Sequence, residues 1–229
     1  MAINGGPIII DKNNLVLHLD ATNYKSYSGH GSIWYDLSGY NNHANLYNSP
    51  TYQEMFIFDG ANQKATVEHS PELNLNSSFT ISAFVKQIGN SFNNSYWNVV
   101  SKYSQFILGP NGNNRMAFLV NANGWEPSGY SSSSTWPNQD INFDIPNYYT
   151  GVYESNSGTL SFYINAVLTV SYNVGKNLSN DTGVIEIAKR DAGGNYFSGG
   201  VDAITLYNKA LTINEISRNY NVAKARFNL

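Results

Sequence analysis

The chain has 229 residues and a formal net charge of -3, and only 13% of its residues are charged. It therefore lacks the basic surface needed to neutralise phosphates, which excludes nucleic acid as an expected partner. The absence of cysteine excludes disulfides, thiolate metal sites and a cysteine nucleophile.

Polar residues are abundant but mostly uncharged, with 34 Asn and 19 Gly. Both residue types accept left-handed backbone conformations, so they supply turns between many short strands. The alternative is a disordered Asn-rich chain, which an aromatic content of 14% disfavours. The composition indicates an all-β protein, and the length suits one domain.

Residues 1–14 form an expected N-terminal extension, followed by a single domain over 15–229. The extension lacks the charged and long apolar regions of a secretory signal. No later run reaches the roughly 18 apolar residues that span a bilayer, so membrane insertion is not expected.

Eleven strands are predicted along the chain, separated by turns rich in Asn and Gly. In 79–86, apolar and polar residues alternate as in an antiparallel sheet with one buried face, but Phe84 interrupts the pattern. The predicted strands are 15–20, 55–60, 79–86, 97–103, 105–109, 116–121, 148–154, 160–165, 167–173, 184–189 and 201–207.

The last strand is followed by a clear helix start. Alternation in 201–207 predicts that Val201 shares one face with Ala203, Thr205 and Tyr207. Thr212 and Glu215 then have the spacing of a capping box, and Leu211 and Ile216 that of a hydrophobic staple. The helix that follows carries an apolar stripe of Ile213, Ile216, Tyr220, Ala223 and Phe227.

Many antiparallel strands with one helix predict an all-β fold, an antiparallel two-sheet jelly-roll sandwich with a short C-terminal helix. Two long connections, 20–54 and 121–144, are the expected places for a binding surface. Edge strands of a sandwich invite pairing, so a homo-oligomer is also expected.

The second long connection combines aromatic and amide side chains, as a carbohydrate-binding site requires. Alternatively, these aromatics cap the core or bury against another subunit. The candidate binding residues are Asn121, Asn123, Trp125, Tyr130, Trp136 and Asn138, with Tyr96 and Trp97 from "NNSYWN".

No catalytic motif stands out. Glu186 and Asp191 in "VIEIAKRD" fall on opposite strand faces, and Asp140 and Asp144 lie in a loop. The four His residues lack metal-binding spacing, and no nucleophile elbow occurs. We expect no catalytic residues and no enzymatic activity, with a glycan hydrolase as the alternative.

Five segments carry a family resemblance that covers most of the chain. They are "LVLHLDATNYKSYSGHGSIWYDLSGYNNHANL" (15–46), "FIFDG" (56–60), "FTISAFVK" (79–86), "GTLSFYINAVL" (158–168) and "YFSGGVDAITLYNKALTINEISRNYNVAKARF" (196–227). In this order they resemble concanavalin A-like lectin/glucanase domains of the laminin G-like group. Glucanases of that superfamily resemble one another in an E-x-D-x-x-E strand, which this sequence lacks.

The resemblance also implies a structural calcium ion, because many relatives bind one through loop carbonyls and an Asp of the terminal strand. The similar positions are Asp20, Asp59 with Gly60, and Asp202, which offer the oxygen ligands that calcium prefers. Alternatively, Asp59 forms a turn with Gly60 and Asp202 faces solvent. In "WYDLSG", Asp36 and Ser38 are expected to fix a packed corner beside Trp34.

The opening block, preceded by "MAINGGPIII", especially resembles domains of tailed-bacteriophage structural proteins. This implies a virion protein made in the host cytoplasm, a decoration module that touches other capsid or tail proteins. Its loops would hold a host-surface glycan or a neighbouring virion protein. A purely structural clamp without sugar binding remains the alternative.

Overall fold

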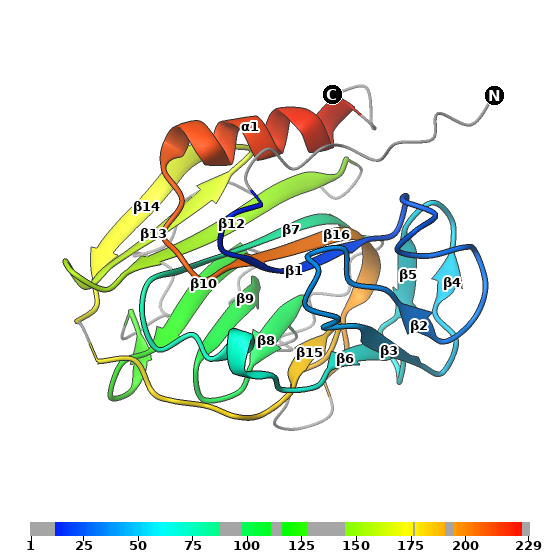
Figure 1. Cartoon of the computed structure of the whole chain (residues 1–229), viewed down its shortest axis with the longest axis horizontal. Coiled ribbons are helices and arrows are strands. Elements are labelled where there is room, and N and C mark those ends of the chain that lie inside the picture. The colour runs from blue at the N-terminus through cyan, green and yellow to red at the C-terminus, as the bar shows by residue number, and fades with distance from the viewer. Residues whose placement is uncertain are drawn as a thin grey trace.

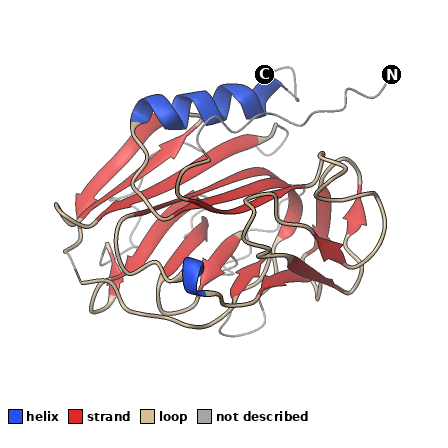
Figure 2. Ribbon diagram, viewed as in Figure 1, coloured by secondary structure: helices blue, strands red, loops and turns tan. Residues whose placement is uncertain are grey.

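The computed structural model describes residues 12–87, 98–110, 116–127, 145–175, 177–190 and 195–225. Two antiparallel sheets of eight strands face each other across an apolar core (Figures 1 and 2). Helix α1 (Ile213–Lys224) lies above one sheet. The predicted two-sheet sandwich with a C-terminal helix is confirmed. Within these ranges, no helix has the length and hydropathy needed to cross a lipid bilayer.

Sheet A lies beneath α1 and has the strand order β14-β13-β12-β7-β16-β5-β4. The long strand β16 pairs with β7 along one side and with β1 and β5 in succession along the other. The strands of sheet A are β1 (Leu15–Asp20), β4 (Thr51–Tyr52), β5 (Phe56–Asp59), β7 (Phe79–Gln87), β12 (Asn147–Glu154), β13 (Thr159–Ile164), β14 (Val167–Asn173) and β16 (Ser198–Tyr207).

Sheet B forms the second layer, with the order β11-β10-β9-β8-β15-β6-β3-β2. A short 3-10 helix, η1 (Pro71–Leu73), follows β6. The strands of sheet B are β2 (Ile33–Trp34), β3 (Ala44–Tyr47), β6 (Lys64–Val67), β8 (Val100–Lys102), β9 (Phe106–Pro110), β10 (Met116–Asn121), β11 (Trp125–Glu126) and β15 (Ile185–Ile187).

All eleven predicted strand regions contain a strand, but the structure adds several short ones. The connection predicted over 20–54 contains β2, β3 and β4, and neither β6 nor β11 was expected. These added strands have two to four residues, too few to show a clear alternation.

The core is rich in aromatic rings supplied by both sheets. The ring of Phe79 in sheet A lies 5.6 Å from that of Phe106 and 5.9 Å from that of Phe118, both in sheet B. Such edge and tilted ring contacts are favourable beyond the area they bury. Gly151 of β12 faces Phe118 so closely that a Cβ at this position would overlap the ring. This glycine therefore lets the two sheets approach at that point.

Helix α1 explains why Phe84 interrupts the alternation of its strand. Phe84 lies on the outer face of sheet A, where it forms a buried cluster with Tyr148 and Ala223, against which Tyr220 packs. The helix begins with the predicted capping box between Thr212 and Glu215. The outer face of this sheet is thus a second, smaller core beneath the helix.

The predicted alternation of the last strand is wrong at one position. The register of β16 shifts between Val201 and Ala203, which is a β-bulge at Asp202. Val201 therefore packs in the main core together with Ile204 and Leu206, and not on the outer face with Ala203. A bulge places two residues opposite one, so it reverses the facing of every residue on one side of it.

Replacing Gly151 should destabilise the sandwich. We expect Gly151→Ala to lower the free energy of unfolding by about 1–3 kcal/mol, because the new methyl group forces Phe118 out of its position. Chemical denaturation of Gly151→Ala, Phe118→Leu and the double variant measures this. A Gly151→Ala penalty that is the same in the natural chain and in the Phe118→Leu variant would contradict the steric cause.

Acid should weaken the start of α1. Partial burial opposes ionisation of Glu215, but hydrogen bonds from Lys209 and Thr212 outweigh it and lower the pKa of Glu215 to about 2. An unfolded Glu has a pKa of about 4.3, so this stabilisation is present above that pH and is lost as pH falls toward 2.

The Glu215→Gln variant tests this dependence. We expect it to lower the free energy of unfolding by about 1 kcal/mol at neutral pH and to flatten the loss of stability between about pH 4.5 and 2. The measurement is urea denaturation as a function of pH. An unchanged pH profile in the variant would assign the acid sensitivity to other groups.

Candidate functional site

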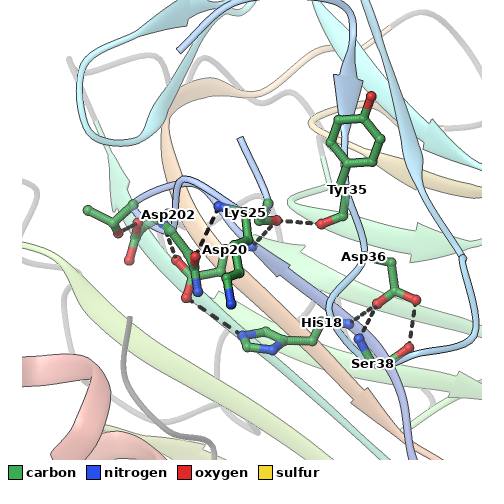
Figure 3. A network of polar contacts seen from close by, with 10 residues as sticks. His18, Asp20, Lys25, Tyr35, Asp36, Ser38 and Asp202 are labelled. Atoms are coloured by element: carbon green, nitrogen blue, oxygen red, sulfur yellow. Dashed lines mark hydrogen bonds and ion pairs between the residues drawn. The ribbon is translucent and has the colours of Figure 1, made fainter. Parts of the chain in front are cut away.

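The corner predicted in "WYDLSG" is present and is organised by Asp36. Its carboxylate accepts hydrogen bonds from the backbone N–H of His18 (2.8 Å), Ser38 (2.9 Å) and Asn42 (3.0 Å), and from the Ser38 hydroxyl (2.6 Å) (Figure 3). Trp34 is fully buried, with its ring against Phe56. These residues anchor the corner to β1 and are structural.

Two of the predicted calcium ligands, Asp20 and Asp202, lie in one buried network (Figure 3). Asp20 accepts from the backbone N–H of Asn23 (3.1 Å), and its other oxygen is 3.7 Å from His18 Nε2. The Thr22 hydroxyl donates to Asp202 (2.5 Å). Burial and then the Asp202 carboxylate raise the pKa of Tyr52. Asp202 does not face solvent, contrary to the alternative considered from sequence.

Asp59 and Gly60, the other two predicted calcium ligands, lie in a separate turn after β5. Asp59 pairs with Ser198, four residues before Asp202 on β16, which is about 13 Å along a strand. Its carboxylate accepts hydrogen bonds from three backbone N–H groups of its own turn. Partial burial acts to raise the pKa of Asp59, but these hydrogen bonds outweigh it and lower the pKa. The four residues therefore do not form one coordination shell.

No cluster of three or more His, Asp or Glu side chains suited to a metal occurs within the described ranges. A calcium ion held by side chains would rely on Asp20 and Asp202 from the predicted set. The calcium site stays a prediction.

The β10–β11 hairpin carries three of the predicted sugar-binding residues. Asn121 accepts a hydrogen bond from Gly124 N–H (2.9 Å), and Asn123 has a positive φ of 69°, so both shape the turn. Trp125 is half-buried and packs against Ala117 and Leu119. Other predicted residues, namely Tyr96, Trp97, Tyr130, Trp136 and Asn138, lie outside the described residues, as do Asp140, Asp144 and Asp191.

Trp125 stands at one end of a row of side chains on the outer face of sheet B. Directly paired residues of an antiparallel sheet share a face, so the pairings define this row strand by strand. The row is Asn45 (β3), Thr66 (β6), Glu186 (β15), Ser101 (β8), Ile107 (β9) and Leu119 (β10). Its apolar end lies against Trp125, and its polar end is centred on Glu186.

Glu186 is buried and held by two lysines. Lys64 Nζ lies 3.1 Å and 3.3 Å from the two carboxylate oxygens, and Lys189 Nζ lies 3.6 Å from one of them. The Lys64 ammonium also lies 5.0 Å from the centre of the Tyr47 ring, which is exposed. Both lysines retain some exposure, so the site offers ammonium donors near the surface above a buried acceptor.

Two hydroxyl groups flank Glu186 in the row, those of Thr66 and Ser101. These residues are 4% and 1% exposed, yet neither Thr66 Oγ1 nor Ser101 Oγ has a hydrogen-bond partner in the part of the chain that the structure describes. An unpaired buried polar group costs about 1–3 kcal/mol. An ordered water would supply the missing partner.

This row combines the groups that a polyhydroxylated ligand needs. At the apolar end, the partly exposed Ile107 and Trp125 can contact C–H groups. At the polar end, the two partly exposed lysines above the buried Glu186 can donate hydrogen bonds to hydroxyls. Sequence reasoning examined Glu186 only for hydrolysis and missed its neighbours. Their common face depends on strand pairing, which the sequence does not reveal. The available signal was the alternation of Ile185, Glu186 and Ile187.

Comparison with known proteins agrees with this architecture. The family model Laminin_G_3, described as the concanavalin A-like lectin/glucanases superfamily, matches residues 59–217, more than half of the chain. No curated protein matches the sequence.

Solved structures of the same fold include domain 4 of the extracellular arabinanase AbnA from Geobacillus stearothermophilus, in complex with arabinotriose. It is 13% identical with a TM-score of 0.67, over 93% of this chain and 100% of that domain.

Two further examples are botulinum neurotoxin binding domains. The serotype D domain, in complex with N-acetylneuraminic acid, is 13% identical with a TM-score of 0.66, over 92% of this chain and 51% of that chain. The DC domain, in complex with rat synaptotagmin II, is 17% identical with a TM-score of 0.64, over 92% of this chain and 52% of that chain. This chain thus spans about half of each toxin domain.

At such low identity, the solved structures show the fold alone. The family assignment follows from the matched family model, which includes most strands of both sheets. The chain belongs to the concanavalin A-like lectin/glucanases superfamily.

Proposed function

We propose that this protein is a non-enzymatic glycan-binding module. The observation that carries the proposal is the row on sheet B, where the apolar patch of Ile107, Leu119 and Trp125 adjoins Glu186 and its lysines. Ile107 and Trp125 are the partly exposed members of this patch, so a sugar would place C–H groups on them. Its hydroxyls would meet Lys64 and Lys189, which lie nearer the surface than the buried Glu186. The glycan complexes formed by proteins of the same fold are consistent with this.

The same row argues for binding without hydrolysis. Glycosidases of the usual kind need two carboxyl groups that flank the scissile bond. The row contains one carboxylate, Glu186, and two lysines already occupy it. Incubation with glycans that bind, followed by an assay for new reducing ends, tests this point. Release of reducing ends that Glu186→Gln abolishes would establish a hydrolase instead.

We further propose that the module is displayed on a phage particle. Support comes from the opening block and its resemblance to tailed-bacteriophage structural proteins. A glycan-binding surface on a virion would hold the particle at a host cell. A particle reconstruction tests this: broad burial of the sheet B row against another virion protein would favour a structural clamp over glycan binding.

Changes in the row should weaken glycan binding without unfolding the protein. We expect Trp125→Ala to lower affinity about tenfold or more, equivalent to about 1.4 kcal/mol. Trp125 is partly exposed, and the substitution removes the apolar contact. A glycan array identifies ligands, and titration calorimetry then measures affinity.

Tyr40→Ala is the matched control for Trp125→Ala, because Tyr40 is an exposed aromatic residue outside this row. It should leave binding unchanged. Equal effects of Trp125→Ala and Tyr40→Ala would remove the row from the binding site.

The calcium proposal has a separate test through stability. If calcium binds at Asp20 and Asp202, added calcium should raise the melting temperature, since a ligand of the native state stabilises it. Asp202→Asn should abolish this shift, whereas Asp59→Asn should retain it, because Asp59 lies on a separate turn. An unchanged melting temperature in calcium would exclude the site.

A further inference from the structure

The strands that end the two sheets in the described part of the chain differ greatly in length. The end strands β4, β2 and β11 have two residues each, whereas β14 has seven. Short edge strands are a usual protection against pairing with other chains. Strand β14, at the left in Figure 1, ends sheet A on one side and lacks that protection.

Strand β1 also borders sheet A, since it pairs with β16 off the main strand path. All six of its residues are buried. The corner around Asp36 covers its outer side, where Leu37 N–H donates to the His18 carbonyl (2.8 Å). This edge is therefore protected by the protein itself. Among the described strands, β14 is the long edge strand that has no strand paired along its outer side.

The composition of β14 also favours pairing. Its sequence, VLTVSYN, contains no charged residue and no proline, the residues that normally block an exposed edge. Val167 and Leu168 are 66% and 53% exposed, so the strand offers apolar area as well as backbone groups. Because the strand is uncharged, a second copy can align with it without like-charge repulsion.

The pairing of β14 with β13 shows which side chains face which way. Val170 lies opposite Phe162 and Tyr172 lies opposite Leu160, so both are on the core side. Ser171 lies on the outer side, with its hydroxyl 3.1 Å from that of Ser161. The register shift in this pair precedes Val170, so the stretch from Val170 to Asn173 is regular.

This regular stretch is complementary to itself. A two-fold axis perpendicular to the sheet and midway between the two β14 strands, level with Ser171, would place Ser171 opposite Ser171 of the second copy. It would also place Val170 of each copy opposite Tyr172 of the other copy, and all four side chains would lie on the core side. Hydroxyl pairs and aromatic pairs with β-branched residues are favourable cross-strand contacts.

We propose that two copies of this chain pair antiparallel along β14, with Ser171 at the two-fold axis, and so join their A sheets into one continuous sheet. The occupant of this edge is a second copy because the same short stretch supplies both halves of each contact.

Cysteine trapping tests the register, because the natural chain contains no cysteine. In Ser171→Cys the two thiols would lie on directly opposed residues, whose Cα atoms are about 4.5–5.5 Å apart, and should form an intermolecular disulfide under mild oxidation. Ser161→Cys is the matched control on the same face, one strand further in. Its two copies would be about 14 Å apart and should not crosslink.

Sedimentation of the full chain over a range of concentrations provides the second measurement. We expect reversible dimers in the natural protein. Ser171→Lys should raise the dimer dissociation constant about tenfold or more, because it opposes two like charges, whereas Ser161→Lys should not. A monomer at every concentration, or equal crosslinking of Ser171→Cys and Ser161→Cys, would overturn the proposal.

Discussion

Strand β16 is the element on which the whole sandwich depends. It pairs with β7 along one side and with β1 and β5 along the other, so both ends of sheet A are joined through it. Its inward residues Val201, Ile204 and Leu206 are fully buried in the main core. Because of the bulge at Asp202, Val201 on one side of it and Ile204 and Leu206 on the other all face the core. The Asp202 carboxylate accepts a hydrogen bond from Thr22 in the loop after β1.

The outer faces of the two sheets carry different kinds of side chain. The outer face of sheet A is apolar around Phe84 and Tyr148 and is covered by α1, whose start is fixed by the Thr212–Glu215 capping box. Sheet B instead carries an outward row that changes from apolar at Leu119 to charged at Glu186. Most side chains of this row are buried, as are those beneath α1. Trp125, Ile107 and the two lysines are partly exposed, and such a mixture of apolar and hydrogen-bonding groups suits ligand recognition.

Local signals in the sequence predicted those elements that depend on neighbouring residues. The capping box at Thr212, the corner around Asp36 and the long alternating strands all follow from short-range patterns. The strands β2, β3 and β4 were missed because they are too short to show a period and are held by pairing with other strands. The row through Thr66, Glu186 and Ser101 could not be predicted, because register alone brings these residues onto one face.

The pairing of β1 with β16 also constrains how the chain reaches its native state. Leu15 lies opposite Tyr207, and the Thr22 hydroxyl meets Asp202 180 positions later. Contacts so distant in sequence slow folding, because the entropy of closing the intervening chain is lost before the contact stabilises anything. During synthesis, β1 must wait until β16 has been made before the two strands can pair. Until then its six residues, buried in the native state, have no native partner strand and are open to non-native contacts.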